Sequence, residues 1–573
     1  MRNSLRVVDF IVDFLRDKEL SHVFGVGGAN IEDLYDAIHH AESGPLGVLA
    51  KHEFSAVTMA DGYHRASQRV PVIAATSGAG AMNLVPGIAE LRASYVPALV
   101  LIGQPPASLD GHGSFQETSG LAGSIDAVRL FGELAVYCAR VDEPESIARL
   151  LPAALAAAMD AATPGPAVLL LPKDVQQAVL APWEPPRASR TYAPPLSPDG
   201  ERARAVDLLR SACERQGVVV VAGEAVARAD ARRQLAWLVD ALGARVAVAP
   251  DAKDVFDRRS PLHLGVVGAI GSGHVQEVLE QASAVVLAGT RLPQMAGAGL
   301  HDHLKGVPVI CVDPRHPFLE PREELVRLTG PVGVELALLA KEVGHAAPEP
   351  DRAAAAEPAP PAEPAPSTPL DMRTAALTVA AHLPGGANVV ADAGNAGATA
   401  IHHVPVPEGG RFIAALGMGG MGHSFGAGIG AAFATGRRTV VLAGDGAFFM
   451  HGMEVHTAVE HQLPVTFVIL NNNAHGMCAT REQLFYSGDY SYNLFRPARI
   501  GDGVAALFPG LDAVTVTTAG ELGAALDRTS STGAPLLVCV DVDAAEMPPF
   551  RPFLQHAMAV GLGRSVNQGV TSP

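Results

Sequence analysis

The segment 439–476 constrains the fold of this 573-residue chain more than any other. It begins with the apolar run Thr439–Ala443, which stops at a Gly-Asp-Gly triplet, and it contains a second apolar run, Val465–Leu470, which stops at three asparagines. Residues 454–461 between them carry apolar side chains at helical spacing, so the sequence predicts a strand–helix–strand crossover in a parallel sheet. Both strands then end at the same edge of the sheet, where open α/β sheets bind ligands.

Two side chains with oxygen atoms, Asp445 and Asn472, follow these strand ends and are 27 positions apart (472 − 445). Carboxylate and amide oxygens are ligands that Mg²⁺ accepts, and the flanking glycines let a phosphate approach the backbone. Taken alone, each motif fits an ordinary turn or loop equally well, since short motifs also match by chance. Together, at matched strand ends, they predict a magnesium and diphosphate site.

Length and composition limit the kinds of protein that this chain can be. At roughly 150 residues per domain, 573 residues need three or four domains. The net charge of −17 argues against nucleic-acid and anionic-membrane partners, because phosphates repel an acidic surface. The five cysteines show no CxxC spacing, and no apolar stretch has the length of a signal or membrane-spanning segment, so we expect a cytoplasmic location.

Helix and strand signals alternate along the chain, which predicts an α/β fold of three doubly wound parallel-sheet domains. In the first domain, 1–180, the expected strands are 22–26, 48–50, 70–75, 98–102 and 168–171. In the central domain, 199–345, they are 218–222, 246–249, 284–288 and 309–312. Residues 346–369 are rich in Ala, Pro and Glu, which predicts an extended linker before the third domain, 370–573.

Glu53 stands out in the first domain because it lies between a predicted strand and an apolar helix, 54–66. A glutamate in the first turn of a helix is often only a favourable partner of the helix dipole. Burial among apolar side chains would instead raise its pKa and prepare it to share a proton with a heteroaromatic nitrogen. This second role requires an aromatic base opposite the carboxylate.

A family resemblance provides such a base. Gly444-Asp445-Gly446 with Asn472 resembles the thiamine diphosphate signature. His52-Glu53 followed by Ala60-Asp61-Gly62-Tyr63 resembles the catalytic-glutamate helix of the enzymes grouped with acetolactate synthase, pyruvate oxidase, benzoylformate decarboxylase and benzaldehyde lyase. Further matches, in chain order, are 24–28, 76–80 with Asn83, 115–117, 164–166 with Pro172, and 417–430. The chain is therefore similar to this family over almost its whole length, from about residue 3 to residue 555.

The resemblance implies how the chain would hold the aminopyrimidine ring of thiamine diphosphate. Glu53 would hydrogen bond to N1′ and stabilise the imino tautomer that removes the C2 proton. The carbonyl of Gly419 would accept the 4′-amino group, and Met421 would hold the cofactor bent. Gln116 would face the substrate, although a Phe-Gln-Glu triplet by itself fits a plain loop as well.

The resemblance also implies how the diphosphate end would be bound. Asp445, the side chain of Asn472 and the carbonyl of Ala474 would bind Mg²⁺. The residues expected around the diphosphate are Gly394, Asn395, Gly446, Ala447, His475 and Gly476. Asn395 stands where relatives often carry glutamine.

The central domain resembles one that binds FAD in some members of the family and no nucleotide in others. Glycines that match the flavin-binding layout are Gly223, Gly268 and Gly289. Residues that replace flavin-contacting ones of relatives are Asp251, Ile270, Pro293 and Met295. These replacements favour glycines that only end strands, so we expect no bound FAD, although the resemblance leaves it open.

The resemblance favours an acetolactate synthase-like enzyme that decarboxylates a 2-oxo acid, with pyruvate as the expected donor, and transfers the acyl group to an electrophilic acceptor. Acetolactate synthases carry a tryptophan after the pair that matches Gly476-Met477, whereas this chain continues with Cys478-Ala479-Thr480-Arg481, which argues against a housekeeping branched-chain synthase. A decarboxylase without ligation and a benzaldehyde lyase-like carbon–carbon lyase share the same cofactor residues, so both stay open. A scaffold without chemistry is disfavoured because Glu53, Asp445 and Asn472 are all present. In this family two subunits build each site, which implies a homodimer or homotetramer with active sites at the subunit interface.

Overall fold

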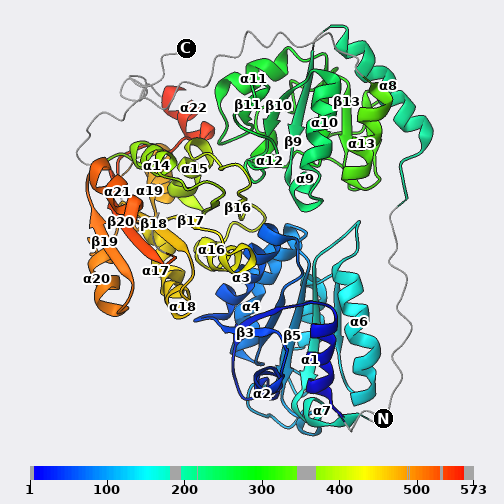
Figure 1. The fold of residues 1–573 in the computed structure, drawn as a ribbon, viewed down its shortest axis with the longest axis vertical. Coiled ribbons are helices and arrows are strands. Elements are labelled where there is room, and N and C mark those ends of the chain that lie inside the picture. Colours follow the sequence, from blue (N-terminus) through cyan, green and yellow to red (C-terminus); the bar gives the residue numbers. More distant parts are fainter. Residues whose placement is uncertain are drawn as a thin grey trace. The chain divides into compact units, whose positions relative to one another are not determined.

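The computed structural model describes residues 5–180, 195–215, 217–344, 370–486, 488, 491–528 and 533–559 (Figure 1). These residues form three six-stranded parallel sheets and a short antiparallel pair, β1 (Leu5–Arg6) with β8 (Val179–Leu180). The chain divides into two compact units. Unit 1 contains 1–193, 415–436 and 450–465, and unit 2 contains the other residues. The predicted α/β fold with three doubly wound parallel sheets is confirmed, whereas the linker predicted at 346–369 lies outside the described residues.

The sheet of unit 1 has the strand order β3-β2-β4-β5-β7-β6. Its strands are β2 (His22–Val26), β3 (Leu46–Leu49), β4 (Val72–Ala75), β5 (Ala98–Gln104), β6 (Tyr137–Arg140) and β7 (Pro166–Pro172). Its helices are α1 (Val7–Asp17), α2 (Glu32–His40), α3 (Glu53–Ser67), α4 (Ala79–Ala93), α5 (Ala127–Leu134), α6 (Ile147–Ala158) and α7 (Lys173–Gln177). All seven residues of β7 are buried, as expected for a parallel strand covered on both faces. The chain runs from β2 to the edge strand β3 and returns to β4 on the other side of β2, which creates a switch point at the carboxyl ends of β2 and β4.

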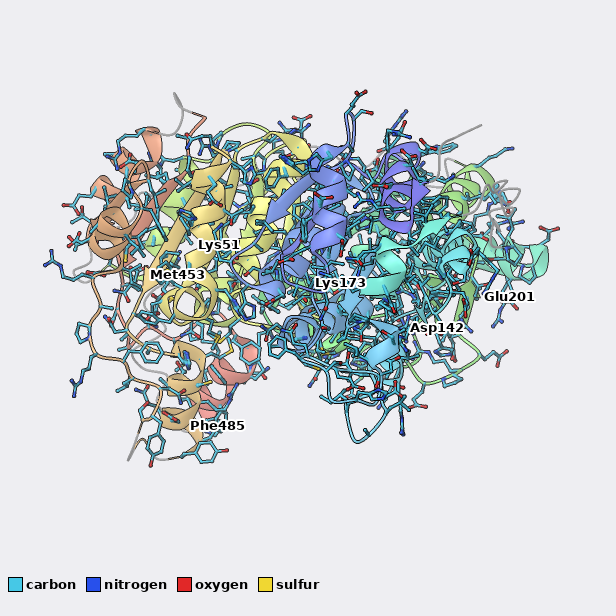
Figure 2. All side chains as sticks on the ribbon, turned by 90° about the horizontal axis from the view of Figure 1, so that it is seen from below. Lys51, Asp142, Lys173, Glu201, Met453 and Phe485 are labelled. Carbon is cyan, nitrogen blue, oxygen red and sulfur yellow. The ribbon has the colours of Figure 1, made fainter. Side chains whose placement is uncertain are left out.

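Unit 1 also contains α16 (His423–Thr435), η4 (Gly452–Glu454) and α18 (Val455–Glu460). Helix α16 packs closely along α3, because a Cβ atom at Gly430 would overlap the carbonyl of Met59, and one at Gly62 would overlap the carbonyl of Ala427. The N–H of Lys51 donates to both carboxylate oxygens of Glu454, at 3.2 and 3.1 Å. Lys51 and Met453, the neighbour of Glu454, are labelled on this part of the molecule in Figure 2.

Unit 2 contains the other two sheets. The central sheet has the order β11-β10-β9-β12-β13-β14. Its strands are β9 (Val218–Ala222), β10 (Arg245–Val248), β11 (His263–Val266), β12 (Ala284–Ala288), β13 (Val309–Val312) and β14 (Leu325–Leu328). Its helices are α8 (Asp199–Cys213), α9 (Glu224–Arg228), α10 (Arg232–Leu242), α11 (Gly273–Glu280), α12 (Gln294–Gly297) and α13 (Val332–Val343). The switch point lies at the carboxyl ends of β9 and β12.

The third sheet has the order β16-β15-β17-β18-β20-β19. Its strands are β15 (Asn388–Ala391), β16 (Phe412–Ala414), β17 (Thr439–Gly444), β18 (Val465–Asn471), β19 (Asp512–Val516) and β20 (Leu536–Asp541). The associated helices are α14 (Met372–Ala381), α15 (Gly394–His403), α17 (Asp445–His451), α19 (Gly476–Phe485), α20 (Ile500–Leu507), α21 (Ala519–Asp527) and α22 (Arg551–Ala559). Strands β15 and β17 are neighbours that flank the switch point, so α15 and α17 both begin there.

The strands predicted from apolar runs match observed strands within a few residues. Three strands of the first two sheets, β6, β11 and β14, were not predicted, and all three lie at a sheet edge. Strands β6 and β11 lack an unbroken buried apolar run, and β14 contains Arg327. The crossover helix predicted at 454–461 is also longer than expected, because the chain is already helical from Asp445 through α17, η4 and α18. The Gly-Asp-Gly triplet therefore spans the end of β17 and the first two residues of α17, and it is not a free turn.

Candidate active site

Glu53 is held in a defined orientation at the start of α3. The carboxylate is buried, and the Nδ2 of Asn83 on α4 donates to its Oε2 at 2.9 Å. A Cβ atom at Gly80 would lie 3.1 Å from Oε1, so the first turn of α4 packs closely against the carboxylate. His52 caps the helix, because its Nδ1 accepts the N–H of Phe54 at 3.1 Å. Glu53 thus lies at the carboxyl edge of the first sheet, as the sequence predicts.

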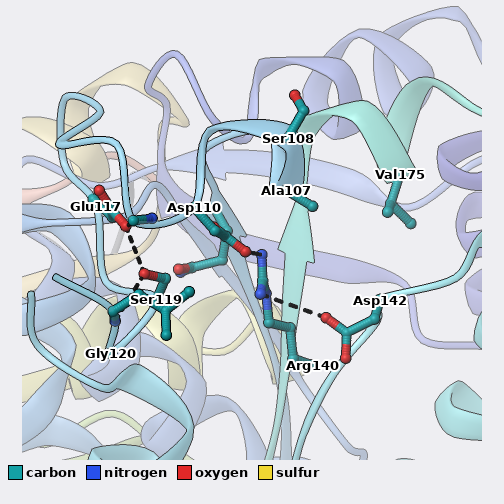
Figure 3. A network of polar contacts seen from close by, with 12 residues as sticks. Ala107, Ser108, Asp110, Glu117, Ser119, Gly120, Arg140, Asp142 and Val175 are labelled. Atoms are coloured by element: carbon teal, nitrogen blue, oxygen red, sulfur yellow. Dashed lines mark hydrogen bonds and ion pairs between the residues drawn. The ribbon is translucent and has the colours of Figure 1, made fainter.

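Gln116 lies on a loop after β5 that is organised by the neighbouring Glu117 (Figure 3). Gln116 adopts a left-handed backbone with φ of 63°, and its Cβ would be 2.7 Å from a Cβ atom at Gly78, which follows β4. The carboxylate of Glu117 accepts bonds from the Oγ of Ser119 at 2.6 Å and from the N–H groups of Gly111, Gly113 and Ser114 at 2.5, 2.9 and 3.1 Å. These bonds, the one from Ser119 foremost, lower the pKa of Glu117.

An ionic cluster fixes the other end of this loop. Arg140 on β6 pairs with Asp110 at 2.6 Å and with Asp142 at 3.5 Å (Figure 3). Phe115, beside Gln116, leaves 82% of its surface exposed. The loop is therefore tied down by ionic contacts while the ring of Phe115 is exposed.

Gly419 and Met421 lie on the segment 417–422, which precedes α16 and belongs to unit 1 with Glu53. Gly419 has a φ of 68°, in the left-handed region that favours glycine, and it is exposed. A Cβ atom at Gly420 would lie 3.3 Å from the ring of Phe54, so the segment lies beside the first turn of α3. The structure thus brings Glu53 and the segment that bears Gly419 and Met421 to the same end of one helix pair.

A buried polar contact joins α3 to the first residue of α16, directly after this segment. The Nε2 of His423 lies 2.6 Å from Oδ2 of Asp61, and both side chains are at most 2% exposed. The Nε of Arg65 lies 2.8 Å from the other oxygen, Oδ1. Burial would raise the pKa of Asp61, but the charge of Arg65 and the bond from His423 outweigh it and lower that pKa well below its usual range.

Asp445 and Asn472 converge in unit 2. Asp445 is the first residue of α17, and Asn472 directly follows β18. The N–H of Ala474 lies within hydrogen-bond distance of Asp445 Oδ2, at 3.0 Å, and of Asn472 Oδ1, at 3.2 Å. Burial raises the pKa of Asp445 to about 6, although backbone N–H groups partly offset it. Among the described residues no three His, Cys, Asp or Glu side chains cluster, so a cation here would need amide and main-chain oxygens beside Asp445.

Asn395, on the first turn of α15, lies beside this pair. A Cβ atom at Gly476 would lie 2.6 Å from Nδ2 of Asn472 and 2.8 Å from Nδ2 of Asn395, so only glycine leaves the two amides in place. The Oδ1 of Asn395 and the Oγ1 of Thr399, one turn further along α15, are buried without a hydrogen-bond partner in the described part of the chain. Such atoms are expected where a polar ligand completes the site.

The remaining predicted diphosphate residues surround the same point. Gly394 begins α15, Gly446 and Ala447 lie in the first turn of α17, and His475 is the N-cap of α19, with its ring 4.7 Å from that of Phe495. The N–H groups at a helix start lack helical partners and favour anions. These helix-start N–H groups and the oxygens of Asp445 and Asn472 fit a diphosphate with Mg²⁺.

The geometry gives a role to two residues of α4 for which the sequence predicts none. Glu90 on α4 is 3% exposed and accepts N–H groups of the segment 417–419, and Asn83, part of the family match, contacts Glu53. The signal for Glu90 was available, because it is a lone acidic residue between the buried Ile88 and Leu91 on a helix of mostly apolar residues. A charge on a buried face needs specific partners.

The fold and the helix starts at the switch point of the third sheet fit an α/β enzyme that binds a diphosphate cofactor. The thiamine pyrophosphate enzyme family matches in three parts: its N-terminal TPP binding domain at 5–123, its central domain at 202–333 and its C-terminal TPP binding domain at 392–540. The chain therefore belongs to the thiamine pyrophosphate enzyme family, and the resemblance predicted from the sequence is confirmed.

Known relatives match over nearly the whole chain. An acetolactate synthase large subunit of Parasynechococcus marenigrum (strain WH8102) is 29% identical over 577 residues, which cover 96% of this chain and 90% of the relative. The acetolactate synthase isozyme 1 large subunit of Escherichia coli (strain K12) is 28% identical over 95% of each chain. The structure of a thiamine diphosphate-dependent 4-hydroxybenzoylformate decarboxylase from Rhodococcus jostii RHA1 superposes with a TM-score of 0.80 at 22% identity, covering 94% of this chain and 99% of the other. None of the described helices is long and apolar enough to cross a bilayer.

Proposed function

We propose that this chain is an acetolactate synthase-like enzyme that uses thiamine diphosphate and Mg²⁺. It decarboxylates a 2-oxo acid, with pyruvate as the expected donor, and transfers the acyl group to an electrophilic acceptor. The observation that carries the cofactor assignment is the convergence of Asp445 and Asn472 oxygens on the N–H of Ala474, beside the unpartnered Oδ1 of Asn395. The similarity to acetolactate synthases over nearly the whole chain supports carboligation.

Glu53 is the proton-holding residue of this proposal. When bound, thiamine diphosphate would supply a nucleophilic carbon for addition to the ketone and a cationic thiazolium ring that takes up the electron pair when carbon dioxide leaves. Glu53 would hold a proton at N1′ of the aminopyrimidine, and the bond from Asn83 goes to Oε2, so Oε1 would make that contact. The carbonyl of Gly419 would orient the 4′-amino group, Met421 would support the bend of the cofactor, and Gln116 would face the substrate.

The diphosphate end is held by the third sheet. Asp445, the side chain of Asn472 and the carbonyl of Ala474 would bind Mg²⁺, which neutralises the diphosphate in a protein whose net charge is −17. The residues proposed around the diphosphate are Gly394, Asn395, Gly446, Ala447, His475 and Gly476. Their role is to bind and orient, so they should affect affinity more than the chemical step.

We infer that the central domain binds no FAD. Its glycines are packed against the protein's own chain: a Cβ atom at Gly223 would overlap the side chain of Thr290, and one at Gly268 would overlap the carbonyl of Met295. Gly223 follows β9 and Gly268 follows the edge strand β11, and both permit close packing of the chain beyond these strands, which supports the inference. Titration of the protein with FAD, followed by calorimetry and by the flavin absorbance spectrum, tests this; saturable binding would contradict it.

The carboligase proposal is tested by the fate of pyruvate. The purified protein, loaded with thiamine diphosphate and Mg²⁺, is incubated with pyruvate, and carbon dioxide, acetolactate, acetoin and free acetaldehyde are measured. Acetolactate or acetoin formed in proportion to carbon dioxide is the expected result. Carbon dioxide accompanied by stoichiometric free acetaldehyde would show a decarboxylase instead.

A non-ligating 2-oxo acid decarboxylase is the second candidate, and the segment 478–481 favours it. This segment of α19 lacks the tryptophan that the acetolactate synthases carry after the matching Gly-Met pair, and the decarboxylase from Rhodococcus jostii RHA1 shares the fold. Arg481, the last residue of this segment, is exposed and lies 3.9 Å from the sulfur of Cys478. Parallel assays with benzoylformate and pyruvate separate the two, since an aromatic donor consumed faster than pyruvate would favour the second candidate.

We further propose a cytoplasmic homodimer or homotetramer, with domains 1–180, 199–345 and 370–573 and with sites built from two subunits. Mixing inactive Glu53→Gln and Asp445→Asn subunits tests the last point. If each site takes Glu53 from one subunit and Asp445 from the other, a mixed dimer contains one unmodified site, and random mixing restores about a quarter of the activity. If both residues come from the same subunit, the mixture stays inactive.

A further inference from the structure

Glu90 has an unusual set of partners in unit 1. Its carboxylate accepts three consecutive main-chain N–H groups, those of Gly417 at 3.2 Å, Met418 at 2.5 Å and Gly419 at 3.2 Å. Glu90 is 3% exposed, whereas the three residues that donate to it are exposed. A buried carboxylate thus holds the inner side of an exposed loop and leaves its outer side open.

The three bonds also fix the direction of the neighbouring carbonyl groups. A trans peptide holds its C=O opposite its N–H, so the carbonyls of Leu416, Gly417 and Met418 face away from Glu90. The peptide that carries the Gly419 carbonyl follows immediately, and it starts from a Cα whose own N–H is held by Glu90. With that N–H held, the direction of the carbonyl depends only on the two dihedral angles of Gly419, of which φ is 68°.

Glu90 is itself held in place by two further side chains. The Oγ of Ser94 donates to Oε1 at 2.7 Å, and the guanidinium of Arg65 lies 3.8 Å from the same oxygen. Arg65 also pairs with Asp61, which contacts His423 on α16. The carboxylate is thus compensated by a cation and by donors, as a buried charge must be. Gly417 completes the arrangement, because a Cβ atom there would lie 2.9 Å from Oε1 of Glu90.

We propose that Glu90 is a positioning residue for thiamine diphosphate. It holds residues 417–419 so that the carbonyl of Gly419 accepts the 4′-amino group of the aminopyrimidine. Glu90 does not touch the cofactor in this proposal; it acts through the backbone of the loop. The inference rests on the proposed function, since it requires that Gly419 contact the aminopyrimidine.

The test compares two cofactors that differ only in the 4′-amino group. Thiamine diphosphate and its 4′-deamino analogue, in which hydrogen replaces the amino group, are titrated into the full-length protein with Mg²⁺ by calorimetry. The unmodified protein should prefer thiamine diphosphate. In Glu90→Gln one acceptor oxygen becomes an NH₂ donor that opposes the loop N–H groups, so the preference should fall by about tenfold, to near equal affinity.

Two controls separate positioning from general damage. Ser94→Ala removes one of the contacts that hold Glu90 but keeps the three loop bonds, so the preference should fall by only about twofold, much less than in Glu90→Gln. Glu335→Gln changes another buried carboxylate, which accepts the N–H of Ser197 in the central domain, and it should leave the preference unchanged even if it lowers stability. A loss of overall stability alone should leave the ratio of the affinities for the two cofactors unchanged.

Each outcome decides a separate point. If the unmodified protein binds neither cofactor, the proposed function fails; if it shows the preference and Glu90→Gln keeps it, the role of Glu90 is wrong. Should Glu90→Gln fail to fold, Gly417→Ala is the second variant. It keeps Glu90 but displaces the loop from it, and it should reduce the preference in the same way; an unchanged preference would again overturn the proposal.

Discussion

The two ends of the proposed cofactor site differ in how far the protein satisfies them by itself. In unit 1 the carboxylates of Glu53 and Glu90 already accept bonds from Asn83 and from the loop at 417–419. In unit 2 burial raises the pKa of Asp445 to about 6, and the Oδ1 of Asn395 has no partner among the described residues. The first end is preorganised by internal bonds, whereas the second keeps a buried oxygen without a partner in the described part of the chain.

This difference has a physical consequence for catalysis. Preorganised groups keep their geometry without the ligand, so changes there should reduce the rate more than the affinity. Strained or unsatisfied groups gain their partners on binding. Changes there should therefore reduce ligand affinity and increase the stability of the unliganded protein. The predictions below test this contrast in order of decreasing effect.

The largest effect should come from Glu53→Gln. Loss of a general acid–base group costs about 10²- to 10⁴-fold in rate, while the diphosphate end stays intact and binding should weaken by no more than about tenfold. Carbon dioxide release from pyruvate measures the rate, and calorimetry measures binding. Glu32→Gln, at the exposed first position of α2, is the matched control and should have no effect. Carbon dioxide release at the unmodified rate would rule out the proton-holding role of Glu53.

Asp445→Asn should reduce cofactor affinity more than the rate, the opposite of Glu53→Gln. Asp445 is the only charged ligand proposed for Mg²⁺, so its removal should weaken the binding of thiamine diphosphate in the presence of Mg²⁺ by about 10- to 100-fold or more. The unliganded protein should become more stable at pH 8 by about 1–3 kcal/mol, because an ionised Asp445 with a raised pKa destabilises the folded state. This gain should disappear below about pH 4, where the carboxyl is protonated in the folded and the unfolded chain alike. Urea unfolding of both proteins at both pH values is the measurement. Equal stability of Asp445→Asn and the unmodified protein at pH 8 would contradict this prediction.

The pH dependence of metal affinity gives a finer test of the same end. Protons and Mg²⁺ compete for Asp445, so affinity should fall by about tenfold per pH unit below a pH of about 6 and level off above it. The diphosphate itself also titrates, so Asp445→Asn is the reference, and the difference between the two pH profiles isolates the carboxylate. Parallel profiles for the two proteins would exclude Asp445 as the titrating ligand.

The smallest effect concerns the scaffold of the preorganised end. Gly430→Ala on α16 should lower stability by about 1–3 kcal/mol or more, because the added methyl group overlaps the backbone of Met59 on α3. Gly503→Ala on α20 is the control; no atom lies within 4 Å of the added Cβ, and the change should stabilise the helix by up to about 1 kcal/mol. Similar urea midpoints for both variants would show that the close approach of α3 and α16 is unimportant.

The sequence predicted most of this architecture because its signals are local. Asp445 and Asn472 could be paired because each follows a buried apolar strand. Glu53 could be identified as a candidate because it starts an apolar helix. Edge strands such as β6 and β11 escaped prediction because their half-exposed residues give no continuous apolar run. The bonds of Glu90 could not be predicted, since its partners are main-chain N–H groups more than 300 positions away and carry no side-chain signature.

One comparison tests the account most directly: titration of thiamine diphosphate, with and without Mg²⁺, into the unmodified protein, Glu53→Gln and Asp445→Asn. We predict Mg²⁺-dependent binding to the unmodified protein, nearly the same binding to Glu53→Gln, and binding to Asp445→Asn that is weak and insensitive to Mg²⁺. Strong Mg²⁺-dependent binding to Asp445→Asn, together with its loss in Glu53→Gln, would contradict the assignment of the two ends.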